Sequence, residues 1–215
     1  MSARPTVRAY IGLGANLGDA AATMAAGVAA LEALPGVHVE AISKLYATAP
    51  WGFTDQPEFR NAAVAVDVVR RSGEVEADAL ALLASLKEIE RSGGRQARAR
   101  WGPRELDLDL LIYGRHRIDV DRSMGGRSID ADVDPEKAAK RLEVPHRHLR
   151  ERLFVLEPLA DLAPRLIPVG WNETIETRRR AVAADEPPGS VRVVGTWDAA
   201  SGRWVASAAR SGGPS

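Results

Sequence analysis

The stretch GRQARARWGPRELDLDLL, residues 94–111, places four arginines directly before an alternating run of leucines and carboxylates. Successive side chains of a β-strand point to opposite faces of its sheet. The alternate leucines therefore share one face, and Asp107 and Asp109 share the other. This alternation predicts a strand over residues 105–114 whose leucine face lies in a hydrophobic core.

Two aspartates on one strand face are unfavourable, because like charges repel and aspartate is a poor strand former. One interpretation is a solvated polar face above the buried leucines. The other is that a bound cation offsets the repulsion between Asp107 and Asp109. Oxygen ligands with no cysteine or histidine beside them suit Mg²⁺, which typically uses one or two carboxylates together with substrate phosphates.

The four arginines of the stretch favour the second interpretation. Guanidinium groups bind phosphate oxygens in bidentate fashion, and arginines with Mg²⁺ commonly neutralise charge in phosphoryl transfer. Trp101 lies between the arginines and the carboxylates, which suits either stacking on a flat heterocycle or packing in the core. His146 has arginines close behind it, which suits either a phosphate contact or a structural role.

The segment GLGANLG, residues 12–18, invites comparison with a dinucleotide-binding turn. The spacing fails, because three residues rather than two separate Gly14 and Gly18, and no acidic residue about twenty positions later completes a convincing βαβ unit. A Walker A loop is excluded as well, because no Gly-Lys-Ser/Thr follows. We interpret the segment as a strand-to-helix turn whose glycines relieve steric strain.

The hydrophobic pattern of the remaining chain mixes strand-like and helix-like segments. We predict strands at 7–13, 37–43 and 61–69, helices after Asp19, over 72–91 and before Pro164, and a hairpin that turns near 200–202. In the second strand, Val37, Val39 and Ala41 are expected to share one face. The lack of regular βαβ spacing favours an α+β fold, with helices on the faces of a sheet, over a doubly wound parallel sheet.

Composition limits the class of protein. Lys and Arg total 29, as do Asp and Glu, and the zero net charge argues against a protein held on nucleic acid by a global basic field. Cysteine is absent, which excludes disulfides and thiolate metal sites. The N-terminus carries no apolar run long enough for a signal peptide or a membrane span, so we expect a cytoplasmic protein.

The 215 residues suggest one main domain with a tail. We place the domain at residues 1–184 and the tail, with a possible small hairpin, at 185–215. Residues 119–140 are polar, with two adjacent glycines and several aspartates, which predicts a mobile insertion.

Four sequence blocks occur in one order: AYIGLGANLGD, TAPWGFTDQPEFRNAAV, RWGPRELDLDLL and VPHRHLRERLFVLEPL. Together they resemble the 6-hydroxymethyl-7,8-dihydropterin pyrophosphokinase family of folate biosynthesis, over roughly residues 7–164. The resemblance implies a ferredoxin-like α+β fold with a mostly antiparallel sheet. It also implies transfer of pyrophosphate from ATP to the hydroxymethyl oxygen of the dihydropterin, which leaves AMP, with two Mg²⁺ ions held by Asp107 and Asp109.

The resemblance further implies roles for individual residues. The catalytic set would be Arg95, Arg104, Asp107 and Asp109. The residues around ATP would be Lys87, Glu90, Arg98, Arg100, Trp101, Arg104, Leu110, Arg141, His146 and Arg152. The residues around the pterin would be Thr48, Ala49, Trp51, Phe59, Asn61, Trp101, Asp107 and Phe154.

The chain departs from the family pattern at several places, two of which concern residues expected to contact the substrates. Phe59 stands where the family often has tyrosine, so any hydroxyl contact there is lost. The second arginine of the family's loop falls on Ala97, with Arg98 one place on, which leaves open whether Arg98 substitutes. The expected partners are the two small-molecule substrates, with no nucleic acid and no membrane, and the expected state is a monomer.

Two alternatives to this function remain open from the sequence. An RNA-binding sheet would need aromatic residues interleaved on its strands and a basic face. Another metal-dependent nucleotidyl- or phosphotransferase could use the same carboxylate pair. Release of AMP that depends on the pterin distinguishes the family's reaction from both.

Overall fold

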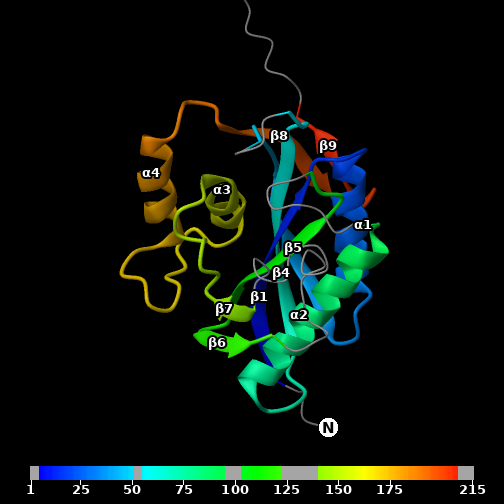
Figure 1. Cartoon of the computed structure of the whole chain (residues 1–215), viewed down its shortest axis with the longest axis vertical. Helices are drawn as coiled ribbons and strands as arrows, with labels where there is room; N and C mark the ends of the chain where they lie inside the picture. Colours follow the sequence, from blue (N-terminus) through cyan, green and yellow to red (C-terminus); the bar gives the residue numbers. More distant parts are fainter. Residues whose placement is uncertain (1–4, 51–54, 95–102, 123–139, 208–215) are drawn as a thin grey trace, which may run out of the picture.

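The computed structural model describes residues 5–50, 55–94, 103–122 and 140–207. At the centre of this part of the chain is a seven-stranded sheet of order β5-β1-β4-β3-β8-β9, in which β2 also pairs with β4 (Figure 1). These strand pairs are antiparallel. The strands are β1 (Thr6–Ala15), β2 (Val37–Ile42), β3 (Leu45–Thr48), β4 (Phe59–Val69), β5 (Asp107–Tyr113), β8 (Val191–Asp198) and β9 (Arg203–Ala206).

Helices cover both faces of the sheet (Figure 1). On one face pack α1 (Ala20–Glu32) and α2 (Val75–Ser92); on the other, α3 (Leu153–Leu162) lies chiefly over β4, with α4 (Ile175–Asp185) against α3. A separate ribbon of β6 (Ile118–Asp121) and β7 (Arg141–Val144) contacts β5 through β7. This arrangement confirms the predicted α+β class. The described helices include none long and apolar enough to cross a membrane.

The alternation predicted for the opening stretch holds over its first half. Leu106, Leu108 and Leu110 are fully buried in the core beneath α1 and α2. Beyond Leu110 the alternation is wrong, because Leu111 and Ile112 are both buried in a second core that includes α3. The cause is a β-bulge, since the pairing with β1 shifts register at this point and a bulge leaves one extra residue in the strand.

The predicted strand-to-helix turn at residues 12–18 is also wrong in part. Gly12 and Gly14 lie inside β1, and within the segment only Gly18 adopts a positive φ, of 55°. A Cβ atom on Gly12 would lie 3.3 Å from the Leu111 side chain, which is tighter than an ordinary contact. Gly12 therefore allows the bulged strand β5 to pack closely, and only the end of the segment turns toward α1, whose N-cap is the predicted Asp19.

The predicted inward face of the second strand needs correction at one residue. Val37 and Val39 pack against the core as expected, but Ala41 is exposed and Ile42 takes its place. The pairing of β2 with β4 shifts register between Val39 and Ala41. A one-residue shift moves every later side chain to the opposite face, which is why simple alternation failed here.

Several elements were not predicted from the sequence, namely β3, α4 and the β6–β7 ribbon. Of the expected insertion at 119–140, residues 119–121 belong to β6, residue 122 follows β6 and residue 140 precedes β7, whereas residues 123–139 lie outside the described part, so its mobility stays a prediction. The expected hairpin of the tail is present, and it joins the main sheet because β8 pairs with β3. Trp204 of β9 is buried and its indole nitrogen donates a hydrogen bond of 2.9 Å to the backbone oxygen of Ser43. The division of the chain at residue 184 stays a prediction.

Candidate active site

The two carboxylates of β5 lie beside two glycines of β1, of which Gly12 is packed against the Leu111 side chain and Gly14 lies next to the Asn61 amide oxygen. Asp107 is paired with Gly14 of β1, and Asp109 is paired with Gly12. Gly14 is in turn paired with Asn61 of β4. Directly paired residues on neighbouring strands lie on the same face, with strands about 4.8 Å apart, so Asp107 and Asn61 stand about 10 Å apart across a glycine floor. Such a floor suits a planar heterocycle.

Asn61 belongs to a small polar cluster at the β4 side of this floor. Its amide nitrogen donates a hydrogen bond of 2.9 Å to the Thr48 hydroxyl, and both residues are buried. This bond directs the amide oxygen toward Gly14, since a Cβ atom there would lie 3.6 Å from it. Phe59 pairs with Thr48 on the same face and is half-buried, whereas Ala49 is exposed at the end of β3.

Beneath the carboxylates, α2 is joined to β5 by a buried ion pair. The Lys87 ammonium lies 2.5 Å from a Glu90 carboxylate oxygen and donates a bond of 2.8 Å to the backbone oxygen of Leu108. The same Glu90 oxygen accepts a bond of 2.7 Å from the Leu108 amide. Lys87 also lies 4.0 Å from Asp109. The predicted ATP residues Lys87 and Glu90 are thus brought to the site, where they hold β5 against α2.

Arg104 reaches the carboxylates from the residues just before β5, and it forms an ion pair with Asp107. Its backbone is fixed by Asn16, a buried residue that sequence reasoning missed. The backbone N–H of Arg104 donates a hydrogen bond of 2.7 Å to the side-chain oxygen of Asn16. The backbone N–H of Asn16 donates one of 2.9 Å to the backbone oxygen of Arg104. The Asn16 side chain also donates to Gln56 and Pro57. The sequence signal that could have identified Asn16 is an asparagine at the end of a predicted strand, in the turn that leads to the next helix.

Two more predicted residues come to the site from the segment between β7 and α3. Burial lowers the pKa of His146, against the opposing effect of the Asp109 carboxylate, so the imidazole is neutral at pH 7. Burial likewise lowers the pKa of Arg152, which faces Asp109 and Asp107. The Arg152 guanidinium lies 5.7 Å from the ring centre of Phe154, so the predicted nucleotide and pterin residues meet here. Leu110 is buried in the core beneath the site.

The β6–β7 ribbon carries one residue that was predicted for the site, and its strand β6 is followed by one that was not. Arg141, predicted to bind ATP, is exposed and bonded to Asp119 at 2.7 Å and to Asp121 at 2.9 Å. Arg122, which was not predicted, is half-buried and faces Asp109, Glu90 and Asp107. Five predicted residues lie outside the described part of the chain: Trp51, Arg95, Arg98, Arg100 and Trp101.

A family relationship accompanies this geometry. The model of the family 7,8-dihydro-6-hydroxymethylpterin-pyrophosphokinase matches residues 10–164. The chain belongs to this family. A 2-amino-4-hydroxy-6-hydroxymethyldihydropteridine pyrophosphokinase of Methylorubrum extorquens is 44% identical over 186 residues, which cover 86% of this chain and 98% of the relative. One of the same name from Pseudomonas aeruginosa is 39% identical over 159 residues, covering 74% and 82%.

Solved structures support the fold. The crystal structure of Plasmodium falciparum HPPK-DHPS with pteroate matches with a TM-score of 0.62 at 16% identity, over 86% of this chain. The match spans 44% of that longer chain. The family's ferredoxin-like α+β fold, with its mostly antiparallel sheet, is therefore confirmed for this protein. As a member of the family, the protein transfers pyrophosphate to hydroxymethyldihydropterin in folate biosynthesis and uses ATP as co-substrate.

The donor set at β5 fits the magnesium expected from the sequence. Among the described residues there is no cluster of three or more His, Asp or Glu side chains able to hold a metal ion. The pair of Asp107 and Asp109 offers oxygen ligands alone, and this is what Mg²⁺ takes when substrate phosphates complete its shell. A structural zinc or calcium site would need more protein ligands than this.

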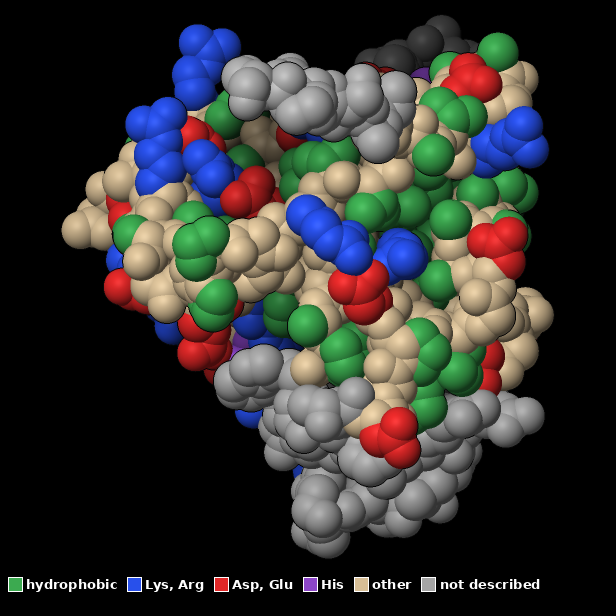
Figure 2. Space-filling model, turned by 90° about the horizontal axis from the view of Figure 1, so that it is seen from above, with side chains coloured by type: hydrophobic (Ala, Val, Ile, Leu, Met, Phe, Trp, Pro, Cys, Tyr) green, Lys and Arg blue, Asp and Glu red, His purple; other side chains and the backbone are tan. Residues whose placement is uncertain are grey.

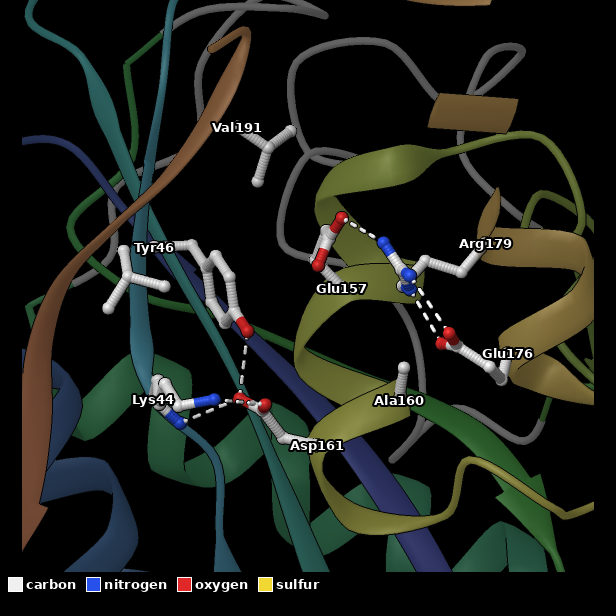
Figure 3. A pocket seen from close by; sticks show the side chains of 9 residues that line it. Lys44, Tyr46, Glu157, Ala160, Asp161, Glu176, Arg179 and Val191 are labelled. Carbon is white, nitrogen blue, oxygen red and sulfur yellow. Dashed lines mark hydrogen bonds and ion pairs between the residues drawn. The ribbon is translucent and has the colours of Figure 1, made fainter. Parts of the chain in front are cut away.

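A second polar cavity, of about 410 Å³, lies between β3, β8, α3 and α4 (Figure 3). The Tyr46 hydroxyl donates a bond of 2.8 Å to Asp161, and the Lys44 ammonium lies 2.7 Å from the same carboxylate. Arg179 lies 2.9 Å from Glu157 and 2.7 Å from Glu176 (Figure 3). This cavity contains no residue predicted for the site.

Proposed function

We propose that Asp107 and Asp109 hold the Mg²⁺ that accompanies ATP, and that the cations around them bind its triphosphate. The observation that carries this proposal is the convergence of Lys87, Arg104 and Arg152 on the two carboxylates from three separate elements. Two Mg²⁺ ions are expected on the pair, and when bound they would neutralise developing charge on the phosphoryl oxygens.

We assign the glycine floor to the pterin. The amide of Asn61, oriented by Thr48, recognises the heterocycle edge, while Phe59 and Phe154 border its faces. The pterin hydroxymethyl group then lies on the side of Asp107 and Arg104. Its oxygen loses its proton and forms a bond to the β-phosphorus of ATP, while the bond from that phosphorus to the oxygen bridging it to the α-phosphorus breaks, so that AMP and a proton leave. Positioning and charge neutralisation supply most of the rate in such transfers.

The remaining predicted residues complete this assignment. Arg95 is proposed as a catalytic arginine, Arg98, Arg100 and Trp101 as ATP residues, and Trp51 with Ala49 as pterin residues, on the family pattern. As expected from the sequence, we propose that the enzyme acts as a monomer on its two small-molecule substrates.

The RNA-binding alternative finds no support in the described structure. Both faces of the sheet are covered by helices, so its strands present no open platform of stacking aromatics (Figure 1). On the face viewed in Figure 2, basic and acidic side chains are intermixed, which fits the zero net charge.

The test is a coupled assay with ATP, Mg²⁺ and 6-hydroxymethyl-7,8-dihydropterin. We expect AMP release that requires all three components. Release of AMP without the pterin would favour the alternative nucleotidyl- or phosphotransferase. Full turnover after chelation of every divalent cation would overturn the magnesium assignment.

A further inference from the structure

The two faces of the β6–β7 ribbon have different environments. In the ribbon, Val120 pairs with Leu142, and both pack inward on the core. The opposite, outward face carries Asp119, Asp121 and Arg141, which are all exposed. Since strand side chains alternate, Arg122 continues the inward face directly after Val120.

Arg122 is fixed in this place by backbone contacts. Its amide donates a hydrogen bond of 2.9 Å to the Lys140 oxygen, and its side-chain Nε donates one of 3.1 Å to the Arg141 oxygen. The hydrogen bond from Nε orients the guanidinium group and leaves its two terminal nitrogens available to a ligand. The side chain is half-buried. Arg122 is therefore tied to the ribbon backbone by one main-chain and one side-chain hydrogen bond.

The groups that face Arg122 are those of the active site. Burial lowers the pKa of Arg122, and the carboxylates of Asp109, Glu90 and Asp107 oppose this effect, while Arg147 adds to it. Within the described part of the chain, no carboxylate lies within ion-pair distance of Arg122, so these three act on it from beyond contact. A guanidinium keeps its charge in proteins and is costly to bury without an anion. An anion held at the carboxylate pair by a metal ion would give Arg122 such a partner.

We infer that Arg122, and not Arg141, supplies the phosphate-binding guanidinium of the β6–β7 ribbon. The ligand class is the magnesium-bound polyphosphate of the nucleotide. Arg122 comes from the β6–β7 ribbon, whereas Lys87, which lies 4.0 Å from Asp109, comes from α2. Arg141 is held away from this role by its two aspartate partners on the outward face. The inference rests on the proposed role of Asp107 and Asp109 as the metal-binding pair.

The experiment compares Arg122→Gln, Arg122→Lys, Arg141→Gln and the control Arg117→Gln in the full chain. Arg117 is exposed and lies just before β6 on the same hairpin. Binding of ATP, inorganic tripolyphosphate and the pterin is measured with Mg²⁺ present, together with a thermal melt and the KM for ATP. Tripolyphosphate isolates the phosphate contacts from those to the base and the ribose.

For Arg122→Gln we expect the affinities for ATP and for tripolyphosphate to fall together, by about 10- to 100-fold, as for loss of a charged hydrogen bond. Pterin affinity should stay within about twofold, and Arg122→Lys should recover part of the loss because it keeps the charge. Arg141→Gln should lose less than Arg122→Gln, and Arg117→Gln should match the parent.

Equal tripolyphosphate affinity in Arg122→Gln and Arg117→Gln would overturn the inference, as would a larger loss in Arg141→Gln. If Arg122→Gln does not fold, Arg122→Lys decides: a severalfold loss supports the inference and parental affinity overturns it. Absence of pterin-dependent AMP release by the parent protein would refute the proposed function instead, and the tripolyphosphate comparison would still decide the role of Arg122.

Discussion

Two polar regions occupy the same face of the central sheet, near its opposite edges. At β5, Asp107 and Asp109 line the glycine floor. Between β3, β8 and the helices α3 and α4, the cavity of Figure 3 contains a comparable number of charged groups. The pairing of Tyr46 with Asn61, and of Asn61 with Gly14, places both regions on one face.

The two regions differ in how their charges are balanced. In the cavity, each acidic side chain lies within 3 Å of a cation: Asp161 of Lys44 at 2.7 Å, and Glu157 and Glu176 of Arg179 at 2.9 and 2.7 Å. At β5, Asp107 is paired with Arg104, but the nearest described cation to Asp109 is Lys87, at 4.0 Å, which is already bonded to Glu90. Polar groups that satisfy one another hold the fold together, whereas a carboxylate left open to a ligand serves the reaction.

The largest expected effect tests the β5 region. Asp107→Asn and Asp109→Asn should each lower turnover about a thousandfold, because an amide oxygen is a poorer ligand for Mg²⁺ and metal stabilisation of phosphoryl oxygens is worth several kcal/mol. The melting temperature without ligand should change little compared with turnover, since asparagine nearly preserves the size of each side chain and the buried leucine face is untouched, although Asp107→Asn gives up the ion pair with Arg104. Single-turnover kinetics across a magnesium series, with melts, measure both.

Asp161→Asn provides the matched control from the cavity. It should lower the melting temperature and leave turnover near that of the parent, because Asp161 bonds Lys44 and Tyr46 and contacts no proposed substrate group. The contrast between the two regions would be contradicted if Asp107→Asn and Asp109→Asn turn over within a few-fold of the parent at low magnesium.

Arg179→Met should destabilise the fold by about 2–3 kcal/mol while turnover stays unchanged. The change leaves Glu157 and Glu176 without their shared cation, and breaking a partly buried pair is costly. Arg180→Met is the control, since Arg180 is 73% exposed and its loss should change stability by less than about 0.5 kcal/mol. Urea unfolding measures both variants, and equal stability of the two would contradict the prediction.

Glu176→Gln should lose about 1–2 kcal/mol of stability at pH 7. Hydrogen bonds from Arg179 lower the pKa of Glu176 from 4.5 to about 2. A lowered carboxyl pKa stabilises the fold above the ordinary pKa, and this contribution is lost as the pH falls from 4.5 toward 2. The difference between parent and variant should therefore shrink across this window. Unfolding curves at pH 7, 4 and 3 test it, and a constant difference would refute it.

The smallest effect is expected for Tyr46→Phe, which removes one hydrogen bond to Asp161. Burial raises the pKa of the Tyr46 hydroxyl, and the bond to Asp161 adds to this, so the group stays a donor throughout the accessible pH range. We expect a loss of about 1 kcal/mol in unfolding free energy and parental turnover. A clear loss of turnover would instead connect the cavity to the reaction.

The sequence alone determined much of the fold, and it supplied most of the residues that are proposed for the site. Alternation and the carboxylate pair predicted β5, its buried leucines and the site beside it, because a strand's side chains have a fixed period of two. The helical period predicted α2, whose apolar face is buried as expected. The four sequence blocks identified the family, and the family pattern predicted most of the residues that lie around Asp107 and Asp109.

Tertiary structure decided what these local periods cannot express. The bulges in β2 and β5 depend on the register of the partner strand, and the place of β8 beside β3 joins residues far apart in the chain. Arg122 is half-buried and Arg141 is exposed, because one face of the two-stranded ribbon packs on the core and the other faces solvent. Local sequence sets the alternation of side chains, but only long-range pairing settles which face lies inside, because that choice depends on burial against distant residues.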